Sequence, residues 1–130
     1  MKMKNEEERE QFLCQFFVPW IGVGVNPSKK NKSWQSQMRS VKHGKEITKL
    51  VLIGERIKPI NRPVKLIATP QKKPCNWDIA NYTRAIKTIE DALVTCGILK
   101  NDTAKLVTQW TIKQPVSNKP DGILISLEKL

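Results

Sequence analysis

The sequence predicts a single small α+β domain, in which helices pack on a mixed β-sheet that ends in a C-terminal hairpin. The chain has 130 residues, which is enough for one hydrophobic core of moderate size but not for two. Stretches with apolar residues at every third or fourth position interleave with stretches in which apolar and polar residues alternate. The resulting order is helix, strand, helix, strand, helix, strand, strand.

The N-terminal part divides into a charged segment, residues 1–14, and the start of the domain, residues 15–130. Asn5, followed by three glutamates, is typical of a capped short helix and equally of a frayed tail. The apolar, β-prone run 16–23 predicts the first strand. Pro19 within this run indicates either an edge strand or a bend.

Two elements are predicted in the middle of the chain. Apolar residues recur at helical spacing from Ile47 onward and predict a helix over residues 45–56, although Gly44 and Gly54 weaken the pattern. The short apolar run 64–69 is bounded by a proline on each side, and it predicts a strand.

The best-defined element is a helix from about Ile79 to Cys96, with its apolar residues on one face and Gly97 in the C-terminal capping role. Alternating patterns then predict strands over 106–113 and 123–128. The turn-rich stretch 115–122 lies between them, so the two strands are expected to form the C-terminal hairpin.

The charge balance indicates an acidic partner. Lysine and arginine number 23 against 12 acidic residues, which gives a formal net charge of +11. Nucleic acid is the leading candidate and an anionic membrane surface the second. Two basic loops and a tryptophan in basic surroundings are candidate nucleic-acid contacts, with solvated loops as the alternative. The candidate residues are Lys29, Lys30, Lys32, Trp34, Lys72, Lys73 and, on the third helix, Arg84.

Other classes are disfavoured. The first residues lack the apolar region of a signal peptide, and no later run approaches the length of a membrane span, so we expect an intracellular, cytoplasmic protein without a membrane partner. Three widely spaced cysteines and a single histidine support neither a disulfide framework nor a zinc site.

Two aspartates bracket the best-defined helix. Asp78 sits in the turn before it, and Asp102 lies five residues beyond Gly97. If the chain folds back after Gly97, the two carboxylates can converge on a hard divalent cation, which prefers oxygen ligands. The alternatives are that Asp78 is only a helix N-cap and that Asp102 is only a turn residue.

The order of residues around this helix resembles the core signature of the RusA family, the Holliday junction resolvases of bacteria and their phages. The family pattern runs Asp-x-Asp-Asn, Lys, Asp-Ala-Leu, Gly, Asp-Asp. The similarity is strongest over residues 77–107, and Val18-Pro19-Trp20 and Asn26-Pro27-Ser28 are similar to the family's opening strand. The matching residues are Asp78, Asn81, Lys87, Asp91, Ala92, Leu93, Gly97 and Asp102.

The resemblance implies a small homodimer that binds four-way DNA junctions in the bacterial cytoplasm, whether host- or phage-encoded, and nicks them with Mg²⁺ held by aspartates. On this basis Asp78 and Asp102 hold the metal. The basic role falls to Lys87 when the motif is counted back from Asp91, and to Arg84 when it is counted forward from Asn81. Lys87 has a structural alternative, as the i to i+4 partner of Asp91 on a solvated face.

Two positions depart from the family pattern. Ala80 stands where the family has its middle aspartate, and Asn101 replaces the first aspartate of the final pair. Asn101 still offers a carbonyl oxygen, but Ala80 offers no ligand. The expected function is therefore a Mg-dependent endodeoxyribonuclease acting on four-way junctions in DNA recombination and repair. The second alternative is a weak or inactive branched-DNA-binding protein of the same fold. The third is an unrelated module that binds RNA or anionic surfaces.

Overall fold

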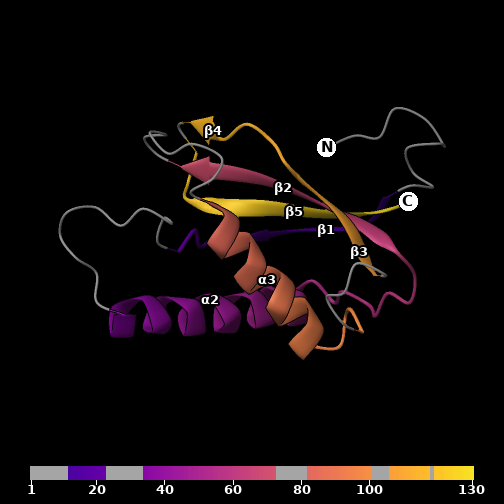
Figure 1. Ribbon diagram of the computed structural model, residues 1–130, viewed down its shortest axis with the longest axis horizontal. Helices are drawn as coiled ribbons and strands as arrows, with labels where there is room; N and C mark the ends of the chain where they lie inside the picture. Colours follow the sequence, from indigo (N-terminus) through magenta and orange to yellow (C-terminus); the bar gives the residue numbers. More distant parts are fainter. Residues whose placement is uncertain (1–11, 23–33, 73–81, 101–105, 118) are drawn as a thin grey trace.

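The protein is a small α+β domain in which two helices lie against one face of a five-stranded mixed sheet (Figure 1). A computed structural model describes residues 12–22, 34–72, 82–100, 106–117 and 119–130. The expected helix near Asn5 lies outside these ranges. The elements are β1 (Phe12–Val18), α2 (Trp34–Gly54), β2 (Val64–Lys72), α3 (Thr83–Thr95), β3 (Val107–Ile112), β4 (Val116–Ser117) and β5 (Gly122–Lys129). The predicted fold class is confirmed.

The strand order is β1-β5-β2-β3, with the short β4 also paired to β2. β5 runs antiparallel to both β1 and β2, whereas β3 and β4 run parallel to β2. The predicted C-terminal hairpin is therefore wrong, because β3 and β5 are not neighbours. The alternating pattern identifies each run as a strand but does not reveal its partner. The fully buried Ile123, Ile125 and Leu127 mark β5 as an interior strand.

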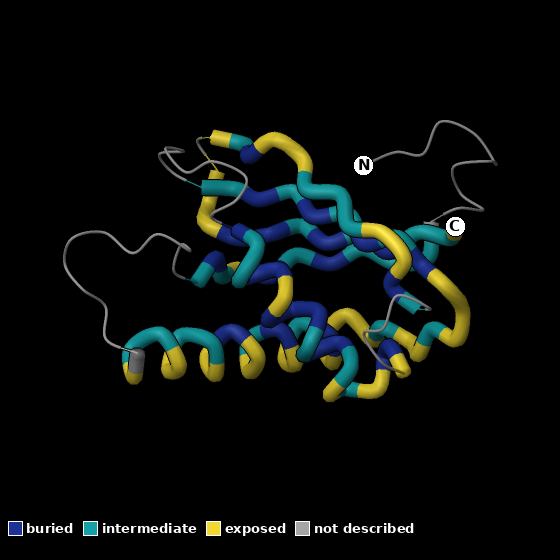
Figure 2. Tube along the Cα trace, in the orientation of Figure 1, coloured by how far each residue is buried: buried dark blue, intermediate teal, exposed yellow. Residues whose placement is uncertain are grey.

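The core lies between the sheet and the two helices. Val64, Leu66 and Ala68 of β2 are completely buried. Leu66 and Ala68 stand in register with the buried Leu127 and Ile125 of β5. Figure 2 shows the buried stretches along the strands and on the sides of the helices that face the sheet. One face of the sheet and one face of each helix thus form a single core, as the chain length predicts.

The N-terminal strand is an edge strand among the described elements, as Pro19 suggested. β1 begins at Phe12, inside the expected charged segment 1–14, and it ends at Val18, immediately before that proline. The strand predicted at 64–69 is confirmed but continues through Pro70 to Lys72. Pro70 is tolerated because it lies between the residues of β2 that pair with β3 and those that pair with β4, where its missing N–H removes no ladder bond on that side.

The helix α2 is much longer than the predicted 45–56, because it begins at Trp34. Its first turns are mostly polar, and their apolar residues at helical spacing, Trp34, Met38 and Val41, form only a short pattern that was not interpreted as a helix. Gly44 is buried beneath the indole of Trp20: a Cβ at this position would lie 2.5 Å from two atoms of the ring. The glycine that weakened the helical pattern is thus required for close packing of α2 against the chain that follows β1.

The predicted helix around the motif is confirmed, and it ends as expected. Its buried face carries Ala85, Ile86, Ile89 and Leu93; Ile79, the expected first residue, lies outside the described ranges. Gly97 has a φ of +77°. The N–H of Ile98 bonds to the carbonyl of Leu93, and the N–H of Gly97 bonds to the carbonyl of Val94. These two bonds form a Schellman cap, in which glycine occupies the left-handed position without steric cost.

Candidate nucleic-acid interface

Many of the predicted site residues lie outside the described part of the chain. Trp34 is described only as the first residue of α2. Lys72, Arg84 and Lys87 are described in full. The predicted residues that lie outside the described ranges are Lys29, Lys30, Lys32, Lys73, Asp78 and Asp102.

After Gly97 the chain lies beside the connection that leads into β2. Ile60 donates its N–H to the carbonyl of Ile98 at 2.7 Å and forms an isolated parallel bridge with Leu99. Further on, Val64 at the start of β2 donates its N–H to the carbonyl of Leu106. The described chain after Gly97 therefore leads toward the start of β2.

The described residues nearest to the two aspartates in the chain, Tyr82 and Lys100, lie beyond opposite ends of α3. The described residues on the other side of each aspartate lie at opposite ends of β2. Lys72, which precedes Asp78, ends this strand, whereas Leu106, which follows Asp102, is bonded to its first residue. Nine residues at about 3.3 Å each make the strand about 30 Å long. The described residues thus do not require the carboxylates of Asp78 and Asp102 to lie close together, and their convergence stays a prediction. Within that framework, no three His, Cys, Asp or Glu side chains are grouped so that they could hold a metal ion.

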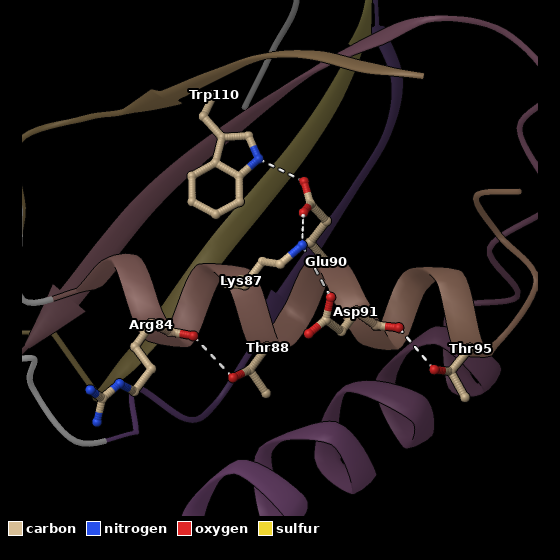
Figure 3. Close-up of polar contacts among 7 residues, drawn as sticks. All are labelled: Arg84, Lys87, Thr88, Glu90, Asp91, Thr95 and Trp110. Carbon is tan, nitrogen blue, oxygen red and sulfur yellow. Dashed lines mark hydrogen bonds and ion pairs between the residues drawn. The ribbon is translucent and has the colours of Figure 1, made fainter. Parts of the chain in front are cut away.

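Lys87 lies in a small charged cluster on α3 (Figure 3). Its Nζ is 3.0 Å from Oε1 of Glu90 and 3.3 Å from Oδ1 of Asp91. The i to i+4 pairing with Asp91, which was the structural alternative for this lysine, is therefore present. The Lys87 side chain is 47% exposed, so the ammonium lies at the surface, and its predicted contact with a phosphate stays a prediction.

Glu90 is a buried carboxylate that sequence reasoning missed. Only 3% of the residue is exposed. One oxygen accepts the bond from Lys87, and the other accepts the indole N–H of Trp110 on β3 at 2.7 Å. Both oxygens of the buried acid are thus hydrogen-bonded, as burial of a charge requires. The available signal is its position: Glu90 is four residues after Ile86 and next to Ile89, on the buried side of α3.

The other two described candidates are also bonded to protein groups. Nη1 of Arg84 donates to Oε1 of Gln37 at 2.8 Å, which ties α3 to α2. Nζ of Lys72 lies 4.0 Å from Oδ2 of Asp121, and the lysine side chain is only 18% exposed. These contacts stabilise the domain, so any contact with DNA at these two positions uses a cation that already has a partner.

The structure adds a basic surface that sequence reasoning did not identify. Because α2 begins at Trp34, two cations that precede the predicted helix share α2 with two that lie within the predicted range. We call them the α2 basic face: Arg39, Lys42, Lys45 and Lys49, all exposed. The recurrence of lysine at 42, 45 and 49 is a helical spacing, and it could have predicted this face from the sequence.

No helix in the described part of the chain combines the length and the apolar character needed to cross a membrane.

We compared the sequence with protein-family models and with curated proteins, and neither comparison found a match.

Proposed function

We propose that the protein is a Mg-dependent endodeoxyribonuclease of the RusA type, which binds four-way DNA junctions and hydrolyses their phosphodiester bonds in the bacterial cytoplasm. The observation that carries the proposal is the ordered motif from Asp78 to Asp102 in a chain of net charge +11. A polyanionic substrate suits that charge. Carboxylates at both ends of the α3 unit are suited to a hard cation.

In this proposal Asp78 and Asp102 hold Mg²⁺. A bound Mg²⁺ lowers the pKa of a water molecule and stabilises the charge that develops on the scissile phosphate. The exposed ammonium of Lys87, or the guanidinium of Arg84 one helical turn before it, neutralises the phosphate. A homodimer would present two such sites related by a twofold axis, which matches the near-symmetry of a four-way junction.

A second candidate is a protein that binds branched DNA without cleaving it. Ala80 and Asn101 remove two carboxylates from the acidic motif, and Lys87 is already paired with Glu90 and Asp91. Fewer carboxylates bind Mg²⁺ less tightly, and a lysine held by two acids has less charge to offer a phosphate. The two candidates share the DNA-binding step and differ in chemistry.

One assay separates them. The purified protein is incubated with labelled four-way junction or linear duplex, in Mg²⁺ or in EDTA. We expect nicking of the junction that requires Mg²⁺. Asp78→Asn and Asp102→Asn should each abolish nicking while junction binding persists, because the substitution removes the metal-binding charge and preserves side-chain size. Retained nicking in either variant would eliminate the metal site. Binding without nicking at any Mg²⁺ concentration would establish the second candidate.

Ala80→Asp tests whether the departure from the family pattern weakens the enzyme. A carboxylate at position 80 adds a hard oxygen ligand, so the Mg²⁺ concentration for half-maximal nicking should fall. The variant should also gain more thermal stability from Mg²⁺ than the original protein does, because a tighter ligand stabilises the folded state more. An unchanged titration in both measurements would show that residue 80 does not face the metal.

A further inference from the structure

The α2 basic face is a row of exposed cations along α2, and its C-terminal members, Lys45 and Lys49, border the pocket shared with α3. Glu46 is the one acidic residue among them. Within the described ranges none of the four cations forms an ion pair. The side of the helix that packs on the core carries the buried Gly44, Thr48 and Leu52. Packing of α2 against the core thus fixes the direction in which the cations point, and Figure 2 shows the exposed positions along the outer side of this helix.

The spacing of these cations suits a linear polyanion. Successive members are three or four residues apart, which is about 4.5–6 Å along the helix axis. The row from Arg39 to Lys49 is therefore about 15 Å long, comparable to about four phosphates of one DNA strand at 3.4 Å each. A rigid helix presents these charges without the entropy cost of ordering a loop.

The basic surface continues toward the C-terminal end of α3. Lys45 and Lys49 line a pocket of about 120 Å³ between the two helices, together with Cys96. Beyond Cys96 lies the exposed Lys100, and the bridge between Ile60 and Leu99 brings the 56–62 connection beside it. That connection carries three further exposed cations: Arg56, Lys58 and Arg62.

We propose that the α2 basic face binds the phosphate backbone of one duplex arm of the DNA substrate, and that the cations of the 56–62 connection and Lys100 extend this track. The choice of branched DNA as the substrate rests on the function proposed above. The presence of the exposed cations on α2 is independent of that function. Contacts made only by surface cations carry no sequence information. The face therefore supplies affinity and orientation, and it leaves recognition of the branch point to other residues.

A membrane surface fits this face less well. The large exposed apolar residues of α2 are Met38, Leu50 and Ile53. Met38 and Leu50 are twelve residues apart, about 18 Å along the axis, and the cations lie between them. An interfacial helix instead needs a continuous apolar stripe that enters the acyl boundary. The arrangement of charge therefore favours a nucleic-acid backbone.

The test compares two triple variants that remove the same number of charges. One is Lys42→Gln, Lys45→Gln, Lys49→Gln on α2. The matched control is Lys113→Gln, Lys119→Gln, Lys129→Gln, three lysines outside α2. Binding to a four-way junction and to linear duplex is measured in EDTA across a salt series. Each lost phosphate contact should reduce the slope of log K against log salt by about 0.9. We expect the α2 variant to lose about 2–3 units of slope and at least tenfold in affinity, and the control less than one unit.

Equal slopes for the two triple variants would overturn the proposal, as would binding of the α2 variant that matches the unmodified protein. Melting followed by circular dichroism verifies that both variants fold, and lysine and glutamine have similar helix propensities. Vesicles containing phosphatidylserine form a further arm: α2-dependent vesicle binding together with equal DNA slopes would assign the face to a membrane and overturn the DNA assignment.

Failure of this inference is distinguishable from failure of the proposed nuclease. The salt series in EDTA involves no cleavage, so a slope difference without nicking in Mg²⁺ supports the DNA-binding face and rejects the enzyme. Nicking by the unmodified protein with equal slopes for the two variants supports the enzyme and rejects the face.

Discussion

Trp110 on β3 donates its indole N–H to the buried carboxylate of Glu90 on α3, at 2.7 Å. This bond connects the helix to the strand that follows it, and Trp110 in turn stands in register with Leu66 on β2. Lys87 satisfies the other carboxylate oxygen. The parallel β2-α3-β3 unit, which carries most of the described motif, is therefore held together by one fully bonded buried charge as well as by apolar packing.

Trp110→Phe should destabilise the protein by about 1–3 kcal/mol, because it leaves one oxygen of a buried carboxylate without its donor while preserving a large aromatic ring. Lys87→Gln is the comparison. Its ammonium is half exposed, so loss of the ion pair is screened by solvent and should cost less than about 1 kcal/mol. Urea unfolding followed by circular dichroism measures both. Equal, small effects would mean that the Trp110 bond contributes little.

The fold class and the α3 unit could be predicted from the sequence, because local patterns determine them. The apolar spacing from Ala85 to Leu93 fixes the helix, and Gly97 fixes its end. The place of β5 could not be predicted. The pairing of β5 with β1 and β2 depends on contacts between residues far apart in the chain. The alternation of Ile123, Ile125 and Leu127 is equally compatible with a hairpin.

The functional surface was predicted in part. Net charge indicated a polyanionic partner, but the loops containing Lys29 and Lys73 lie outside the described residues, and the surface that is described lies on α2. The start of α2 at Trp34 was missed because the first half of this helix is mostly polar and shows little apolar spacing. Tertiary packing, including that of Gly44 against Trp20, stabilises this half of the helix instead. Glu90 was missed because burial of an acid is expected only where hydrogen-bond donors are known to surround it. One of its two donors, Trp110, lies twenty residues away in the sequence.

Gly44→Ala should destabilise the protein by about 1–3 kcal/mol, since the new methyl group would overlap the Trp20 ring. Alanine favours a helix over glycine by about 1 kcal/mol, so a net loss would show that packing outweighs propensity. Gly54→Ala is the matched control on the same helix. A Cβ at that position meets no atom within 4 Å. It should be neutral or stabilising in the same thermal melts, and a stabilising Gly44→Ala would contradict the packing.

Both helices end in a Schellman cap, but with different residues in the left-handed position. In α2 this residue is Arg56, with a φ of +54°; Ile57 donates to the carbonyl of Leu52, and Arg56 to that of Ile53. Arg56→Gly should therefore stabilise the protein by about 0.5–1 kcal/mol, and Gly97→Ala should destabilise it by about 1 kcal/mol. Chemical denaturation gives both values. Opposite signs are required: if Arg56→Gly destabilises, the arginine makes a compensating contact.

Burial raises the pKa of the Cys14 thiol from 9.0 to about 11, and a hydrogen bond from the backbone of Leu127 offsets part of this effect. At pH 8 its thiolate should therefore react with iodoacetamide about a hundredfold more slowly in the folded protein than in urea. Peptide mass spectrometry distinguishes it from the other two cysteines. Between pH 9 and 11 the folded state binds the proton more tightly, so this group's contribution to stability falls as pH rises. Equal labelling rates in both states would contradict the burial.

Substitution of Lys87 can separate its structural role from its proposed catalytic role. If its ammonium neutralises the scissile phosphate, it must exchange Asp91, whose side chain is 36% exposed, for the substrate while Glu90 stays bonded to Trp110. Lys87→Gln should then reduce junction nicking at least tenfold with little change in melting temperature, and Lys87→Arg should restore part of the rate because it returns the charge. Arg84→Gln is the comparison, because Arg84 ties α3 to α2 through Gln37. Its substitution should cost about 0.5–1.5 kcal/mol of stability with nicking preserved in the folded fraction. The reverse result, with nicking lost at Arg84 and preserved at Lys87, would assign the basic role to Arg84 and leave Lys87 as a structural partner of Glu90.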